Sequence, residues 1–182
     1  MAKYEIKDGV CIIPEGTTEI ESYAFFDKGA LTNIVIPDSV TEIGESAFKS
    51  CGLTSVVIPD SVTKIGDYAF SDCCALTSIE IPTSVTEIGD FAFFGCTGLT
   101  SVVIPSSVTE IGDHAFFGCT GLTNGEIHSP EIEFGIRVLC ECENLKSIKV
   151  PAKKADYYKK RLPEELHDLI VEMEPKKKTK KK

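Results

Sequence analysis

Long apolar runs are absent from this 182-residue sequence, and none approaches the roughly 18–20 residues that a membrane-spanning helix needs. The first ten residues, MAKYEIKDGV, lack the apolar stretch of a secretory signal. We therefore expect a cytoplasmic chain, or a surface protein if a leader was removed. Glycine-rich phosphate loops and C-x-x-C pairs are also missing, so no motif indicates a nucleotide or a structural zinc.

Positive charge is scarce outside the C-terminus. The chain has 19 basic and 28 acidic residues, and six of its lysines stand in the run KKKTKKK at 176–182. Residues 1–175 therefore carry a net charge of −15, which does not suit a phosphate-binding surface. We expect the tail Lys176–Lys182 to be solvated and disordered, because like charges at that density repel. It serves solubility in the simplest interpretation, with weak nucleic-acid contact or attraction to an anionic membrane surface as alternatives.

What the sequence does have is an internal repeat of 23 residues. Successive prolines are 23, 22, 23, 23 and then 46 residues apart, and His128 stands at the skipped position. Leucine, isoleucine, Ala-Phe and glycine columns share this period, and the best units are residues 53–75 and 99–121. The six prolines at this repeat position are Pro14, Pro37, Pro59, Pro82, Pro105 and Pro151. Periods of this length are typical of solenoids.

Each unit has a physical interpretation. The segment LTSVVIP alternates at its end like a strand, which proline terminates because it lacks an amide donor. VTEIG predicts a second short extended piece, with glycine for a tight turn. The Asp or Glu that follows suits a helix N-cap, and the YAFSDC-type stretch predicts about one helical turn. One unit cannot bury its apolar side alone, so we expect a stack of parallel strands roughly 4.8 Å apart.

The pattern L-x-x-V/I-x-I-P-x-x-V-T-x-I-G-x-x-A-F-x-x-C, close over residues 31–121 and looser over 10–151, resembles the BspA-like leucine-rich repeat family. The resemblance implies a right-handed, curved β-rich solenoid that binds other molecules, often at the cell surface, and no shared catalytic residues. Repeat six, residues 122–144, departs from the pattern with Gly125, Glu126, His128 and Glu131.

The domain organisation follows from the repeat limits. We expect one solenoid over residues 1–175, with an N-terminal cap at 1–14, repeats at 15–151 and a C-terminal cap at 152–175. The N-terminal cap reads as a β-hairpin around Asp8-Gly9. The C-terminal cap reads as a helix over 152–162 that lays Tyr157 and Leu162 on the last coil, ends at Pro163 and is followed by a final apolar piece at 166–173.

Candidate chemistry is sparse. Of eight cysteines, five stand at or near one repeat position, and a ladder of buried thiols is favoured over disulfides or metal. The repeated glutamates Glu19, Glu42, Glu87 and Glu110 indicate one solvated column, interrupted by Lys64. No nucleophile can be placed against a base. We therefore predict no enzymatic activity, no catalytic residue, no cofactor and no metal site.

Two surfaces are candidates for partner binding. The first is the outward row of the long strands, which solenoids often use for partners, although Val and Thr also simply favour strands. Its candidate residues are Ile12, Val35, Val57, Glu80, Val103 and Glu126, continued by Lys149 and flanked by Thr54, Thr77 and Thr100. The second is aromatic, with i, i+3 pairs that either form an exposed patch or pack between coils, the latter being favoured. Its residues are Tyr23, Phe26, Phe91, Phe94 and Phe117, with His114 beside Phe117.

The sequence thus predicts a non-catalytic interaction module that presents a rigid strand face to a protein partner. One alternative is an adhesin-type surface protein, or a fragment of one, without its secretion signal. A second alternative is a nucleic-acid-associated protein that acts through the lysine tail.

Overall fold

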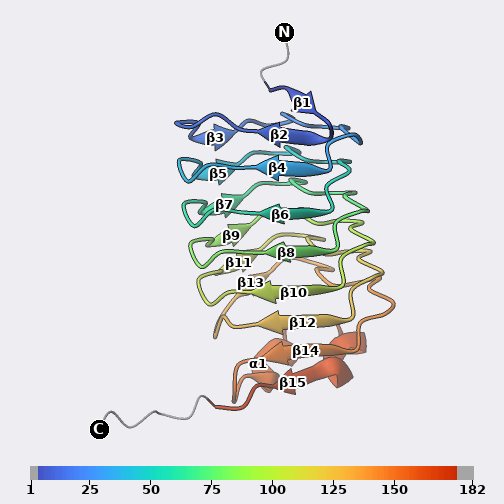
Figure 1. Ribbon diagram of the computed structural model, residues 1–182. Coiled ribbons are helices and arrows are strands. Elements are labelled where there is room, and N and C mark those ends of the chain that lie inside the picture. The colour runs from blue at the N-terminus through green and yellow to red at the C-terminus, as the bar shows by residue number, and fades with distance from the viewer. Residues whose placement is uncertain (1–3, 176–182) are drawn as a thin grey trace, which may run out of the picture.

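The computed structural model describes residues 4–175, which form a stack of similar coils with the N-terminus at one end and the C-terminal cap at the other (Figure 1). The predicted tail at 176–182, with its suggested nucleic-acid contact, lies outside the described residues. Each regular coil holds one longer and one two-residue strand. The longer strands are β2 (Val10–Ile12), β4 (Asn33–Val35), β6 (Ser55–Val57), β8 (Ser78–Glu80), β10 (Ser101–Ile104), β12 (Asn124–Ile127) and β14 (Ser147–Val150). The short strands are β3 (Glu19–Ile20), β5 (Glu42–Ile43), β7 (Lys64–Ile65), β9 (Glu87–Ile88), β11 (Glu110–Ile111) and β13 (Glu133–Phe134).

Neighbouring coils pair in parallel and in the register of the repeat. Val103 of β10 lies opposite Glu126 of β12, and Glu87 of β9 lies opposite Glu110 of β11. The six short strands form one continuous sheet. On the long-strand side β4 lies beside β6 and β8 beside β10, so the stack runs through all seven longer strands of the described residues. The predicted parallel-strand solenoid is confirmed.

The core is a set of columns that run along the stack. The repeated Leu, Ile, Val and Phe side chains are buried, most of them completely. The column Phe25, Phe48, Phe70, Phe93 and Phe116 is a continuous stack with ring centroids 5.0 to 5.4 Å apart. Each coil therefore removes its neighbour's apolar side from water, which is why one repeat alone has no core.

The predicted helical turn is wrong. The YAF-type stretch is a run of turns in which two residues per coil have positive φ, such as Phe91 (55°) and Gly95 (67°). Its amides alternate between two acceptors: Phe94 N–H donates to the Phe91 carbonyl three residues back, and Phe93 N–H donates to Ala115 in the next coil. The stacked coil supplies an acceptor at every second residue, so the backbone bonds along the stack rather than around a helix.

The acidic residue after the glycine therefore does not cap a helix. A carboxylate oxygen of Asp67 accepts the amide of Asp90 at 2.9 Å, and Asp90 does the same for Asp113 at 2.7 Å. The preceding glycine serves close approach rather than a turn with positive φ. A Cβ at Gly66 would lie 2.8 Å from the Ile43 carbonyl oxygen, so a side chain there would push two coils apart.

The repeat cysteines form a buried column of free thiols. Each thiol donates to a phenylalanine carbonyl of the preceding coil, as Cys73 does to Phe48 at 3.0 Å and Cys96 to Phe70 at 3.1 Å. Burial raises the pKa of Cys51 to about 11 and that of Cys73 to about 12, because the interior penalises the thiolate. The thiols act as small apolar residues with one donor each.

Both ends carry added structure. At the N-terminus β1 (Ile6–Lys7) pairs antiparallel with β2 around Asp8 and Gly9, which have φ of 51° and 80°. The Tyr4 ring stacks on Phe25 at 5.1 Å. At the C-terminus stand α1 (Ala155–Lys159), the 3-10 helix η1 (Glu164–Leu169) and β15 (Ile170–Glu172). β15 pairs in parallel with β14 and lengthens the long-strand sheet by one strand.

Candidate interaction site on the strand face

The strand face is the outward side of the long strands, and its midline is an in-register column. Strand pairing sets Ile12 opposite Val35 and Val57 opposite Glu80, and carries Val103 through Glu126 to Lys149. The apolar members are unusually exposed, at 71% for Ile12, 51% for Val35, 75% for Val57 and 48% for Val103. Single exposed apolar residues are common, but a row of them on one sheet indicates an interaction surface.

The column continues one residue further than predicted. Val171 of β15 lies opposite Lys149 and is 51% exposed. Sequence reasoning treated this segment as a final apolar piece, because it lacks the proline and threonine marks of the repeat. Within β15, the half-buried Ile170 and the exposed Val171 point to opposite faces, as successive residues of a strand do.

Threonines stiffen one edge of the strand face. The amide and the hydroxyl of Thr77 both donate to the Thr54 carbonyl, at 3.1 and 3.2 Å. Thr100 makes the same pair of bonds to Thr77. The predicted residues Thr54, Thr77 and Thr100 thus use their donors within the stack and leave only acceptor capacity toward a partner.

Repeat six introduces polar groups into the column. Glu126 accepts from His128 at 2.9 Å and pairs with Lys149 at 3.5 Å. His128 replaces the repeat proline and so regains an amide, which donates to the Ile104 carbonyl at 2.8 Å. The column is therefore apolar at Ile12, Val35 and Val57, alternates through Glu80 and Val103, is charged at Glu126 and Lys149, and ends on the apolar Val171.

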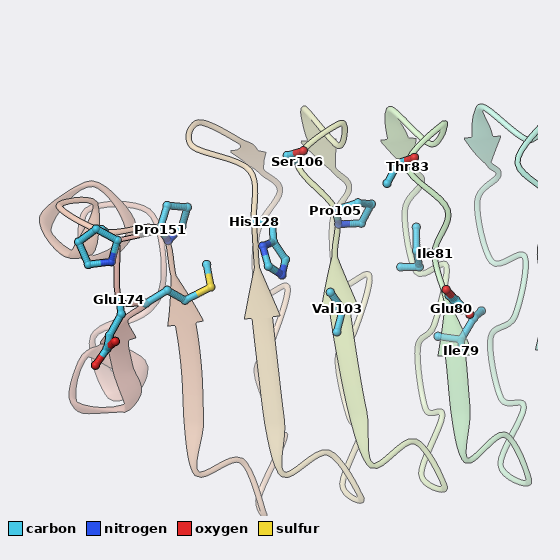
Figure 2. Close-up of a pocket in the computed structure, with 13 residues that line it drawn as sticks. Ile79, Glu80, Ile81, Thr83, Val103, Pro105, Ser106, His128, Pro151 and Glu174 are labelled. Carbon is cyan, nitrogen blue, oxygen red and sulfur yellow. The ribbon is translucent and has the colours of Figure 1, made fainter. Parts of the chain in front are cut away.

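A groove of about 730 Å³ lies at the carboxyl ends of β8, β10, β12 and β14 (Figure 2). It contains two predicted residues, Glu80 and Val103. The rest of its lining includes His128 and the segment Met173–Pro175 that follows β15. Sequence reasoning missed this groove, because residues outside the repeat form one of its ends.

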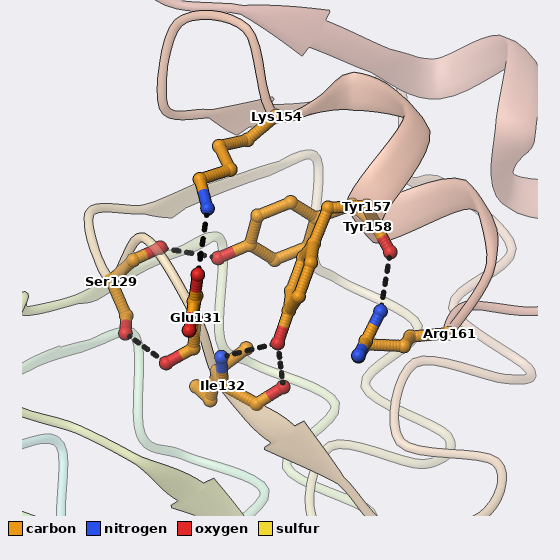
Figure 3. Close-up of polar contacts among 7 residues, drawn as sticks. All are labelled: Ser129, Glu131, Ile132, Lys154, Tyr157, Tyr158 and Arg161. Atoms are coloured by element: carbon orange, nitrogen blue, oxygen red, sulfur yellow. Dashed lines mark hydrogen bonds and ion pairs between the residues drawn. The ribbon is translucent and has the colours of Figure 1, made fainter.

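The C-terminal cap closes the stack beside this groove (Figure 3). Tyr158 is fully buried and its hydroxyl donates to the Ser129 carbonyl. The Tyr157 hydroxyl accepts from the Ile132 amide at 3.0 Å and donates to the carbonyl of the same residue at 3.1 Å. The predicted helix over 152–162 is only five residues long. Tyr157 and Leu162 pack against the core, and Tyr158, which was not predicted, is the fully buried ring.

One departure of repeat six, Glu131, meets this cap. Lys154 of the cap pairs with Glu131 at 3.1 Å, and the buried Ser129 hydroxyl bonds to the Glu131 carbonyl. The neighbour of this coil on the cap side is therefore a helix rather than another VTEIG segment. Glu131 stands where the repeat has valine, because this position faces the cap and pairs with its Lys154.

The predicted aromatic residues fall into two groups. Tyr23 and Phe26 are exposed, at 54% and 44%, and Tyr23 donates to Glu45 at 2.6 Å. The other group is half-buried between coils: Phe91 stacks on His114 at 4.8 Å, and Phe94 stacks on Phe117 at 5.5 Å. Two coils separate the groups, one with Ser46 and Lys49 and one with Tyr68 and Ser71, so the five predicted residues do not form one continuous patch.

The opposite sheet carries charge rather than apolar side chains. Its short strands align Glu19, Glu42, Lys64, Glu87, Glu110 and Glu133 in one column. Lys64 pairs with Glu87 at 2.7 Å, and this bond raises the lysine pKa. This column is the predicted row of glutamates, with Glu133 added after Glu110.

Within residues 4–175, no group of three or more His, Cys, Asp or Glu residues is arranged to hold a metal ion. None of the helices in that range has the length and apolar character to cross a membrane.

Comparison with known proteins identifies the repeat. The profile of a "BspA type Leucine rich repeat region" matches residues 9–76 and 63–162, with six copies. The chain belongs to the BspA-type leucine-rich repeat family. No curated protein sequence matches it.

Solved structures share this BspA-type fold. A leucine-rich repeat protein from T. pallidum is 26% identical with a TM-score of 0.67, and the match covers 91% of this chain and 90% of that one. A leucine-rich repeat protein from Bacteroides ovatus is 23% identical with a TM-score of 0.51, over 91% of this chain and 54% of that one. The BspA-type assignment is consistent with a protein-interaction or adhesin-type repeat module.

Proposed function

We propose that the protein is a non-catalytic interaction module that presents the strand face to a protein partner. The observation that carries the proposal is the midline of that face, where Ile12, Val35, Val57 and Val103 are about half to three-quarters exposed on neighbouring long strands of the stack. An exposed apolar column costs solubility unless a partner covers it, and monomeric proteins rarely keep contiguous apolar surface without a use.

Rigidity supports the same function. The backbone of the strand face is bonded on both sides along the stack, and the threonine hydroxyls add a second row of bonds. Side chains on such a grid lose little conformational freedom when a partner docks, so more of the contact energy appears as affinity.

The test replaces Val57 and Val103 together by glutamate. Each new glutamate lies on the solvent side but opposite an existing one, Glu80 or Glu126, so circular dichroism and the urea midpoint must first show that the double variant is folded. The control is Thr97→Glu, at an exposed turn position whose equivalent in repeat six is Glu143. Cross-linking in native cells followed by mass spectrometry first identifies the partner, and its affinity is then measured with purified proteins.

We expect the Val57→Glu, Val103→Glu variant to lose at least 2 kcal/mol of binding free energy, as hot-spot positions do, while Thr97→Glu binds normally. Parental affinity in the double variant would remove the strand face as the docking surface.

A further inference from the structure

The groove at the carboxyl ends of the long strands has an apolar floor and a carboxylate at each end. Val103, Pro105, Pro151 and Met173 provide apolar lining. Figure 2 shows Glu80 and Glu174 at opposite ends of the row of labelled side chains, with His128 and Val103 between them. A groove of about 730 Å³ is within the range of sites that bind small ligands and short peptide segments.

Within residues 4–175 the two carboxylates have no counter-ion. Among the described residues neither Glu80 nor Glu174 takes part in a hydrogen bond or ion pair, and the groove lining contains no lysine or arginine. Glu126, between them along the stack, differs because His128 and Lys149 already pair with it. The unpaired negative charge is therefore confined to the ends of the groove.

The spacing of these ends defines what fits. Four strand steps separate β8 from β15, which corresponds to about 19 Å at the usual distance between strands. An extended peptide covers this length in about six residues. Alternate side chains of such a peptide point to the same side, so cations at its first and seventh positions would bracket apolar side chains at its third and fifth.

We propose that the groove binds an extended basic segment of the partner, with two Lys or Arg side chains six residues apart on Glu80 and Glu174 and apolar side chains between them on Val103 and Met173. The inference rests on the proposed function and specifies the chemistry of the partner. The net charge of −15 on residues 1–175 attracts such a segment at long range, and the groove gives it one register.

The probe is the fluorescently labelled peptide Arg-Thr-Val-Thr-Val-Thr-Arg, titrated with the full chain and followed by fluorescence anisotropy. Two control peptides replace both arginines by glutamate or both valines by serine. The protein variants are Glu80→Gln with Glu174→Gln, and a matched pair, Glu110→Gln with Glu133→Gln, which removes the same charge from the short-strand sheet.

We expect Glu80→Gln with Glu174→Gln to weaken binding about tenfold, the order for two partly exposed ion pairs, and the matched pair to change it less than twofold. Both control peptides should bind more weakly than the probe. Equal weakening by both variant pairs would reduce the effect to general charge attraction and overturn the proposal. Failure of the parent chain to bind the probe better than the glutamate peptide would also overturn it, as would equal binding of the serine peptide.

Failure here is distinguishable from failure of the proposed function. If the probe does not bind but Val57→Glu with Val103→Glu still abolishes partner binding, the strand face docks a partner of other chemistry. If the peptide binds and Val57→Glu alone, at a position outside the groove lining, leaves the partner's affinity unchanged, the groove acts without the rest of the strand face.

Discussion

Gly125 occupies a core position where every comparable coil has a larger side chain. The inward column of the long strands reads Ile34, Val56, Ile79, Val102, Gly125 and Ile148. A Cβ built on Gly125 meets no atom within 4 Å, and φ there is not positive. A small apolar cavity of about 10 Å³, roughly one water-sized sphere, lies beside it among residues such as Phe116 and Phe134.

Gly125→Ala should therefore stabilise the fold. Burying one methyl group contributes about 0.8 kcal/mol. Removing the conformational freedom of glycine from the unfolded chain adds about 0.4–1 kcal/mol. The expected gain is about 1–2 kcal/mol, which for a chain of this size raises the melting temperature by roughly 3–6 °C.

The assay is urea and thermal unfolding followed by circular dichroism, with Gly66→Ala as the matched control. A Cβ at Gly66 would lie 2.8 Å from the Ile43 carbonyl oxygen, so this variant should lose about 1–3 kcal/mol. The two Gly→Ala changes thus have opposite expected signs within one protein. A destabilised Gly125→Ala, or the same response at both glycines, would refute the cavity argument.

Three further predictions concern the phenylalanine column and the cysteines. Phe93→Ala should cost about 3–5 kcal/mol in urea unfolding, because this fully buried ring stacks on Phe70 at 5.4 Å and on Phe116 at 5.0 Å, and a nearly unchanged midpoint would place it outside the core. The exposed Cys74 should react with a thiol reagent at neutral pH while the buried Cys51 and Cys73 remain unlabelled until the chain unfolds, as mass spectrometry would show. Because the folded pKa values of about 11 and 12 lie above the ordinary thiol value, stability should be fully present below about pH 8.5 and decline as the pH rises toward 11–12; a flat profile there would contradict burial of these thiols.

The repeat columns allowed the solenoid and its strand register to be predicted, because burial of Leu, Ile and Phe at a fixed period leaves one way to stack. The turn stretch was misjudged for a physical reason. Phe91 and Phe94 have helical spacing, but the amides of Phe91, Phe93 and Gly95 donate to the next coil, and those acceptors do not appear in a local sequence window. Bonds between stacked coils, rather than the local sequence, therefore set the conformation of the turn stretch.

The outward column of the candidate site could be predicted, and the groove could not. Alternation within each strand identified Val57, Glu80 and Val103 as outward-facing residues. The groove depends on Met173 and Glu174, which follow a strand without repeat marks, and on His128, which looked like decay of the pattern. Neither segment has a periodic signal that places it near β8.

Because the junctions between regular coils are alike, the length of the solenoid can change by whole coils. Every regular junction uses the same backbone bonds and the same buried columns, so excising one whole unit, for example residues 76–98, joins two surfaces that already match. Loss or duplication of a unit would shorten or extend the rod by about 4.8 Å and leave both end structures untouched. The distance between the two end structures can thus change in steps of one coil, while the end structures themselves stay the same.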